Sequence, residues 1–118
     1  MGYDWAKDCV HVPFGLVSME DGTMSTRQGR VVFLEDVLNR AVEQTKQIIL
    51  EKNVTTENID ETAHDVGVGA VVFNELSNYR IKDYVFSWDK VLNFEGETGP
   101  YVQYTHARAC SVLRNAGE

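Results

Sequence analysis

From Leu34 to Ile49 the chain repeats apolar and small residues at steps of three and four, and no other feature constrains its fold as strongly. The positions that form this stripe are Leu34, Val37, Leu38, Ala41, Val42, Thr45, Ile48 and Ile49. The pattern predicts an amphipathic helix that ends near Lys52 and Asn53. Glu35 and Asp36 lie in its first turn, where acidic side chains suit the helix dipole. A helix with one apolar face must pack against another element, so a globular fold is expected.

Ahead of this helix, an apolar run from Cys9 to Met19 is rich in β-branched and aromatic residues. Its near-continuous apolar character predicts a strand that is buried on both faces, as in a parallel sheet. Pro13 indicates that the first half is an edge or an irregular entry. Short strands are also predicted at Val31–Phe33 and Tyr84–Phe86.

Behind the first helix, the sequence predicts further helical segments. Thr55 and Thr56 can cap a second helix, in which Gly67 and Gly69 either interrupt or bend the helix or let another backbone approach closely. The remaining predictions are a short buried helix over Ala70–Ser77, a helical turn over Trp88–Leu92, and a last helix over Pro100–Asn115 that Thr98 or Gly99 caps. The fold class is therefore mainly α with a small β component.

Composition excludes several classes of protein. The chain has 118 residues, of which 43% are hydrophobic and 25% charged, which fits one globular domain with a modest core. It contains no run of about 18 apolar residues and no signal-peptide pattern, so no membrane association and a cytoplasmic location are expected. The formal net charge of −7 argues against a free-standing nucleic-acid binder. Cys9 and Cys110 have no partner at metal-ligand spacing, so reduced thiols and no metal site are predicted.

Two stretches carry the functional signal. The first is the polar loop Asp21-Gly-Thr-Met-Ser-Thr-Arg-Gln-Gly-Arg30, which lies between the predicted strand and the amphipathic helix. Alone, such a loop is most often a solvated connection. The second is the run from Val85 to Arg108, which contains Ser-Trp-Asp, Asn-Phe-Glu-Gly-Glu-Thr-Gly-Pro-Tyr and Tyr-Thr-His-Ala-Arg.

In this order and spacing, the two stretches resemble arginyl-tRNA synthetases, which are class I aminoacyl-tRNA synthetases. The loop resembles the class I signature Lys-Met-Ser-Lys-Ser: Met24 and Ser25 match, Thr23 and Thr26 stand where lysines are usual, and Arg27 stands where the last serine is usual. The Ser-Thr-Arg form is similar to that of the arginyl branch.

The resemblance implies an internal piece of a longer enzyme. Residues 1–33 would be the C-terminal end of a Rossmann-type nucleotide-binding catalytic domain with its signature loop. Residues 34–95 would be a helical stem-contact region, and residues 96–118 the first helix of an α-helical anticodon-binding domain. On that last helix, the polar positions Tyr101, Gln103, Tyr104, His106 and Arg108 would either meet tRNA or pack between domains.

The resemblance also implies site residues and substrates. Ser25, Thr26 and Arg27 would be catalytic, and Gly15, Met24, Ser25, Thr26 and Arg27 would bind ATP. ATP with magnesium, arginine and tRNA(Arg) would be substrates of the parent enzyme. A guanidinium such as that of Arg27 can grip phosphate oxygens as negative charge builds on them.

The part of the class I active site that an upstream His-x-Gly-His-like motif supplies is missing from this sequence. The isolated chain is therefore expected to be inactive and to self-associate through surface that the parent would cover. The alternative is a non-enzymatic interaction module that derives from a synthetase segment.

Overall fold

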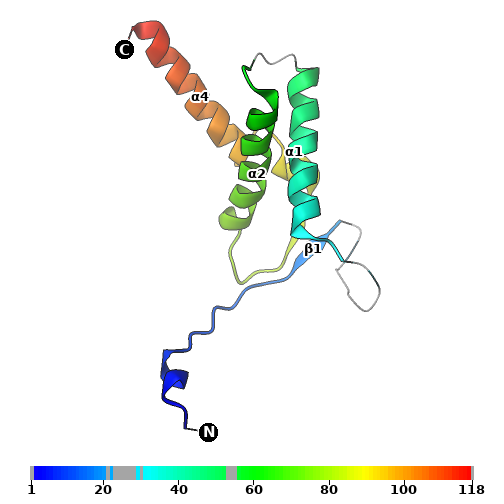
Figure 1. Cartoon of the computed structure of the whole chain (residues 1–118), viewed down its shortest axis with the longest axis vertical. Helices are drawn as coiled ribbons and strands as arrows, with labels where there is room; N and C mark the ends of the chain where they lie inside the picture. The colour runs from blue at the N-terminus through cyan, green and yellow to red at the C-terminus, as the bar shows by residue number, and fades with distance from the viewer. Residues whose placement is uncertain (1, 21, 23–28, 30, 53–55, 118) are drawn as a thin grey trace.

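The computed structural model describes the chain except residues 1, 21, 23–28, 30, 53–55 and 118 (Figure 1). The elements, in order, are the 3₁₀ helix η1 (Asp4–Asp8), β1 (Val17–Met19), α1 (Leu34–Glu51), α2 (Ile59–Ser77), β2 (Tyr84–Phe86), α3 (Trp88–Val91) and α4 (Gly99–Ala116). The described chain is thus mainly helical with a small sheet, as the sequence predicted. It is elongated, with extents of 67 × 37 × 24 Å, and its termini lie at opposite ends (Figure 1).

The strands β1 and β2 form a parallel two-stranded sheet in which Val17 pairs with Tyr84 and Met19 with Phe86. The predicted parallel pairing and the Tyr84–Phe86 strand are confirmed. The predicted strand over Cys9–Met19 is too long, because only its last three residues pair. Burial on both faces is also wrong, since Phe14 is 80% exposed and nothing in the described chain covers it.

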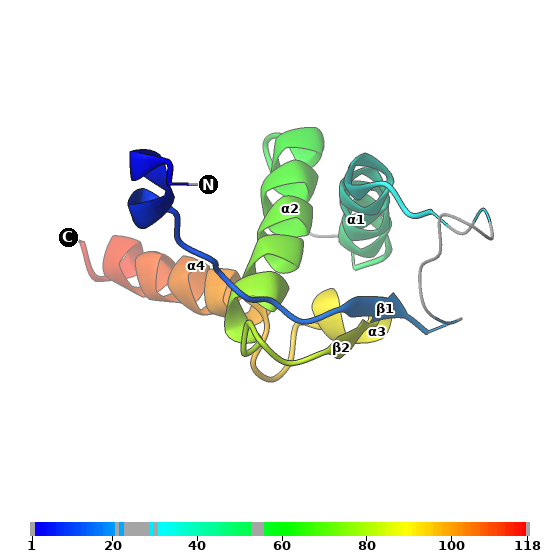
Figure 2. The same cartoon turned by 90° about the horizontal axis from the view of Figure 1, so that it is seen from below.

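The amphipathic helix predicted from Leu34 is confirmed as α1, with Ala41, Thr45 and Ile49 buried along one face. Phe33, which was predicted to end a short strand, instead precedes the first turn of α1, and Val31–Phe33 forms no strand. The core lies where α1 and α2 meet the sheet and α3, whose arrangement is seen in Figure 2. Its buried members are Ala41, Ala70, Val71, Phe86, Val91 and Leu92.

The helix α2 runs without a break through both glycines, so the predicted interruption does not occur. The other alternative, close backbone approach, is confirmed at Gly67, whereas Gly69 is approached by a side chain. A Cβ on Gly67 would lie 2.8 Å from the backbone nitrogen of Val42, and one on Gly69 would lie 2.8 Å from Nε2 of Gln103. Missing side chains thus allow α1 to pack on one side of α2 and α4 on another.

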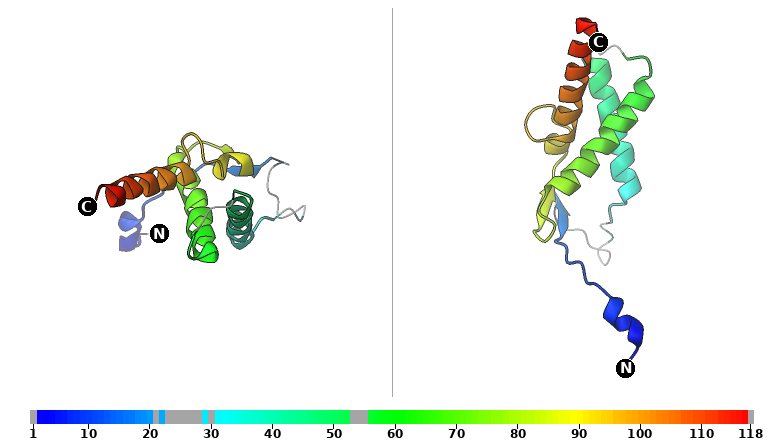
Figure 3. Two further views of the ribbon diagram at one scale, coloured as in Figure 1. Left: turned by 90° about the horizontal axis from the view of Figure 1, so that it is seen from above. Right: turned by 90° about the vertical axis from the view of Figure 1, so that its left-hand side faces the viewer.

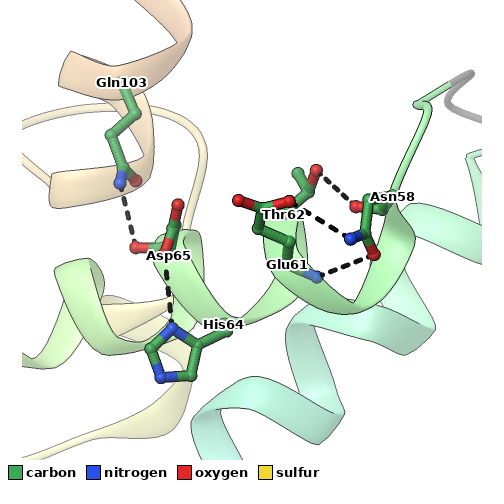
Figure 4. A network of polar contacts seen from close by, with 6 residues as sticks. All are labelled: Asn58, Glu61, Thr62, His64, Asp65 and Gln103. Atoms are coloured by element: carbon green, nitrogen blue, oxygen red, sulfur yellow. Dashed lines mark hydrogen bonds and ion pairs between the residues drawn. The ribbon is translucent and has the colours of Figure 1, made fainter.

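The start of α2 differs from the prediction. Asn58, rather than Thr56, is the N-cap: its Oδ1 accepts from the backbone N–H of Glu61 at 3.2 Å, and its Nδ2 donates to the carboxylate of Glu61 at 3.1 Å (Figure 4). This reciprocal pair satisfies a free amide of the first turn. The predicted cap Thr55 lies outside the described residues.

The last helix begins as predicted, with Thr98 as its N-cap and Pro100 in the first turn. Only the start of α4 is buried, at Gly99 and Pro100, and the helix then projects away from the α1–α2 pair (Figures 1 and 3). Gln103 ties it to α2 by donating to the carbonyl of Asp65 at 3.1 Å (Figure 4). The α3 turn is also confirmed, at Trp88–Val91.

Candidate functional site

The candidate site lies at the carboxyl end of β1, where the chain leaves the sheet. Met19 and Gly22 close a tight turn, with backbone hydrogen bonds of 3.1 and 3.0 Å between them. Gly22 and Gly29 both have positive φ, +124° and +70°, a conformation that L side chains rarely adopt. Glycine at these two positions therefore permits backbone conformations at both ends of the polar loop that other residues rarely adopt.

The loop itself carries most of the predicted site. Met24, Ser25, Thr26 and Arg27 lie outside the described residues, so their predicted roles stay predictions. What the structure describes is the frame on either side of them: the end of β1, the Met19–Gly22 turn and the start of α1.

Gly15 is the one predicted site residue that is described. It lies two residues ahead of β1, and a Cβ at this position would overlap the backbone carbonyl of Lys82. Its N–H donates to the carbonyl of Arg80 at 2.8 Å. The close approach that glycine permits is thus made to the backbone of residues 80–83, and its predicted role beside ATP stays a prediction.

The neighbouring residues continue this contact. The N–H of Leu16 donates to the carboxylate Oδ1 of Asp83 at 2.7 Å, and the N–H of Tyr84 donates to the carbonyl of Leu16 at 3.0 Å. The side chain of Ser18 adds a longer bond of 3.4 Å to the carbonyl of Tyr84. The strand that leads into the loop is therefore held by the segment from Arg80 to Tyr84, more than sixty residues away in sequence.

Aromatic and cationic side chains lie beyond the end of β2. The ring of Trp88 meets that of Phe86 edge-on, with centroids 5.0 Å apart. The guanidinium of Arg40, on α1, lies 4.6 Å from the centre of the Trp88 ring, which is a cation–π distance. This stack joins α1 to α3 close to the edge where the two parallel strands end. In open parallel sheets, ligands bind at that edge.

A groove of about 1070 Å³ opens between α1, α2, α3 and α4, and sequence reasoning missed it. Its walls include the aromatic residues Trp88, Phe94, Tyr101 and Tyr104. The signal was present in these aromatic positions, but they are spread over separate elements. Only the folded chain brings them to one surface.

The polar positions predicted on the last helix differ in their surroundings. Gln103 is occupied by its bond to α2, whereas Tyr101, Tyr104, His106 and Arg108 are exposed. Arg108 contacts Tyr104, with a hydrogen bond of 3.4 Å to the hydroxyl and its guanidinium 5.7 Å from the ring centre. Both predicted alternatives, contact with tRNA and packing between domains, remain open for these exposed side chains.

The titratable groups of the described chain show few perturbations. Partial burial raises the pKa of Glu75, whose carboxylate accepts from the hydroxyl of Tyr84. A hydrogen bond to Asp60 raises the pKa of Lys46, at an N–O distance of 2.6 Å. Within the described residues, no group of three or more His, Cys, Asp or Glu side chains is placed to hold a metal ion. Cys9 and Cys110 are both free thiols.

Comparison with protein families gives the class. Residues 1–88 match the family described as "tRNA synthetases class I (R), catalytic domain". That range contains both strands, the loop, α1 and α2. The chain therefore belongs to the class I tRNA synthetases.

Closer relatives give the branch of that class. The chain is 70% identical over 116 residues to the arginine–tRNA ligase of Clostridioides difficile and 68% identical over 116 residues to that of Halothermothrix orenii, in each case over 98% of this chain. It belongs to the arginyl-tRNA synthetase family. The matches cover only 20% of either relative, so the chain spans about a fifth of their length.

Solved structures agree. The arginyl-tRNA synthetase of Thermus thermophilus matches with a TM-score of 0.82 and 39% identity, over 92% of this chain and 18% of that protein. The Plasmodium falciparum enzyme matches with a TM-score of 0.68 and 31% identity, over 88% of this chain and 17% of that protein. No helix in the described parts of the chain is both long and apolar enough to cross a membrane.

Proposed function

We propose that this chain is a segment of an arginine–tRNA ligase, which activates arginine with ATP and transfers it to tRNA(Arg). The observation that carries the proposal is the 70% identity to such an enzyme along nearly the whole chain. Because the chain spans about a fifth of that relative, the activity is assigned to the longer protein. The isolated 118 residues are proposed to be inactive.

In this proposal, the loop Met24–Arg27 acts on ATP. Arginine activation is an attack of the amino acid's carboxylate on the α-phosphate, with pyrophosphate as the leaving group. Negative charge spreads over the phosphate oxygens as the bond to pyrophosphate breaks. Hydroxyl donors on Ser25 and Thr26 and the guanidinium of Arg27 would stabilise that charge more in the transition state than in the ground state. Arginine suits this task because its planar fork can hold two phosphate oxygens at once.

Two features of the described frame support this assignment. The loop follows a parallel strand at its carboxyl end, the edge at which such sheets bind ligands. Positive-φ glycines also flank it, at Gly22 and Gly29. Gly15 and Met24 complete the proposed ATP-binding set. Magnesium would enter as the ATP complex, and we assign it no ligand among the described residues.

The proposed division of the chain follows from the same family. Residues 1–33 would close the nucleotide-binding domain, residues 34–95 would form the helical stem-contact region, and residues 96–118 would begin the anticodon-binding domain. The projection of α4 away from the α1–α2 pair supports a change of domain near Thr98 (Figure 1). We place the parent enzyme in the cytoplasm. With a net charge of −7 on this segment, most of the affinity for tRNA would come from other parts of the parent.

The test uses the full-length gene product and the isolated chain side by side. We expect arginine-dependent ATP–pyrophosphate exchange, measured with and without tRNA(Arg), and tRNA charging from the full-length protein. No exchange is expected with lysine in place of arginine, and no adenylate from the isolated chain. Exchange by the full-length protein that does not depend on arginine would refute the proposal. A native gene product limited to these 118 residues would favour the non-enzymatic interaction module instead.

A further inference from the structure

The segment just ahead of β1 is held in an unusual way. A three-residue strand offers few ladder bonds, so its position depends on the contacts that flank it. On the approach to β1, the backbone N–H of Leu16 takes the carboxylate of Asp83 as its acceptor, at 2.7 Å. A side chain thus supplies the bond that a neighbouring strand would otherwise provide.

Further contacts on either side of this bond constrain the backbone of Gly15 and Leu16. Gly15 donates to the carbonyl of Arg80 at 2.8 Å, and Leu16 accepts from Tyr84 at 3.0 Å. The absent side chain of Gly15 lets the two backbones touch, since a Cβ there would overlap the carbonyl of Lys82. Three successive contacts therefore fix the register in which Val17 enters the sheet opposite Tyr84.

The carboxylate of Asp83 has no other role in the described structure. It forms no salt bridge within the described residues, where the ion pairs are Lys7–Asp4, Lys46–Asp60 and His64–Asp65. A charged acceptor on a backbone N–H makes a stronger bond than a neutral one. Its partner lies 67 residues earlier in the sequence, so the bond couples the segment that follows α2 to the strand that precedes the loop.

We propose that Asp83 is a positioning residue for adenylate formation. By holding the N–H of Leu16, it fixes β1 and, with it, the Met19–Gly22 turn from which the chain continues into Thr23. The inference rests on the proposed function, because it assigns Asp83 to that reaction. We assign Asp83 no contact with the reacting atoms.

A positioning role predicts a particular kinetic pattern. Small displacements of catalytic groups slow the chemical step far more than they weaken ground-state binding. Loss of the carboxylate should therefore lower kcat for arginine-dependent pyrophosphate exchange while the KM for arginine stays the same. An amide oxygen at the same position can still accept from the N–H of Leu16, so asparagine should largely restore the rate.

The experiment compares three variants of the full-length protein, with rates normalised to active sites by titration. We expect Asp83→Ala to lower kcat about tenfold, and Asp83→Asn to stay within about threefold of the unsubstituted enzyme. Asp8→Asn is the matched control, because it removes the same charge from an exposed residue of η1 and should leave kcat unchanged. Hydrogen exchange of the peptide that contains Leu16 should be faster in Asp83→Ala and unchanged in Asp8→Asn.

The outcomes separate this inference from the proposed function. An unsubstituted protein without arginine-dependent exchange refutes the proposed function. An active parent whose Asp83→Ala variant keeps its kcat, or only raises the KM for ATP, refutes the positioning role. So does an Asp83→Asn variant that is as slow as Asp83→Ala, because the bond would then not be what matters.

Discussion

Two regions of this molecule contain similar apolar residues, which are buried in one region and exposed in the other. In the α1–α2 pair and the sheet beneath it, Ala41 and Ala63 are fully buried and Val71 is 4% exposed. In the segment ahead of β1, Val10 is 84% exposed and Phe14 80% exposed. The far half of α4 resembles the second region, with Val112 and Leu113 both more than half exposed.

The difference shows that burial depends on a matching partner rather than on apolar character. The stripe of α1 finds a complementary face on α2, whose glycines let the helices approach. Within the described chain, Gly15 and Leu16 are held by the segment from Arg80 to Tyr84, through backbone hydrogen bonds and the carboxylate of Asp83. The chain spans about a fifth of its relatives, and surfaces of this kind are typical of contact sites.

The largest effect is expected from the predicted loop residue Arg27, which lies outside the described residues of both regions. Arg27→Ala in the full-length parent should lower the rate of arginine activation by about 10²–10³, the usual loss for one donor that stabilises transition-state charge. Its midpoint of urea unfolding should stay unchanged. Pyrophosphate exchange at varied ATP measures the rate. An unchanged kcat with a raised KM for ATP would mean that the loop only holds substrate.

The next largest effect is expected at the contact between α1 and α2. Gly67→Ala places a Cβ within 2.9 Å of the backbone of Ala41, which cannot move alone. Such overpacking costs about 3 kcal/mol, and the better helix propensity of alanine offsets about 1 kcal/mol, which leaves a net loss of about 2 kcal/mol. Urea unfolding of the chain measures it.

Gly69→Ala is the matched control on the same helix. Its Cβ would meet the side-chain amide of Gln103, which can turn away at the cost of its bond to Asp65. Its stability should stay within about 1 kcal/mol of the unsubstituted chain. Equal losses from both substitutions would show that the α1–α2 contact is no tighter than the α2–α4 contact.

A smaller effect is expected on the far half of α4, where Val112 and Leu113 are both more than half exposed. We expect the isolated chain to self-associate, and Leu113→Lys to weaken that association about tenfold while stability changes by less than about 0.5 kcal/mol. Leu76→Lys is the control, because Leu76 is an exposed leucine on a different helix, α2. Sedimentation over a range of concentrations measures the oligomeric state of each variant. A monomer at all concentrations would show that these exposed faces do not bind each other.

Sequence reasoning succeeded where local signals and packing agree. The stripe of α1, the Thr98-Gly-Pro start of α4 and the strand at Tyr84–Phe86 each carry a short-range pattern with one structural outcome. It failed at Cys9–Met19, because a run of apolar residues does not reveal whether neighbouring strands are present. It also left α2 undecided, because the fate of a glycine in a helix depends on what approaches it.

The candidate site was only partly predictable for a related reason. The loop and its flanking glycines are contiguous, so a motif and two backbone requirements are visible in the sequence. The carboxylate of Asp83 is a single acidic residue with no motif around it, and its partner lies 67 positions away. The stack of Arg40 on Trp88 likewise joins two distant elements. Contacts of this kind become visible only in the folded chain.

The smallest expected effect is electrostatic and concerns Glu75 on α2, whose carboxylate accepts from the hydroxyl of Tyr84 on β2. Partial burial raises the pKa of Glu75, so the folded chain holds this proton more tightly than the unfolded chain does. Stability should therefore fall as the pH rises from the ordinary pKa of a glutamate through the raised value in the fold. Glu75→Gln should remove this pH-dependent contribution to the free energy of unfolding, which is small because the side chain is largely solvated. Urea unfolding between about pH 4 and pH 7, a range that brackets the pKa of a glutamate, measures the slope of the unfolding free energy against pH. Glu57→Gln is the control at an exposed glutamate. A slope that is the same with and without Glu75 would show that the carboxyl has no net preference for its protonated form in the fold.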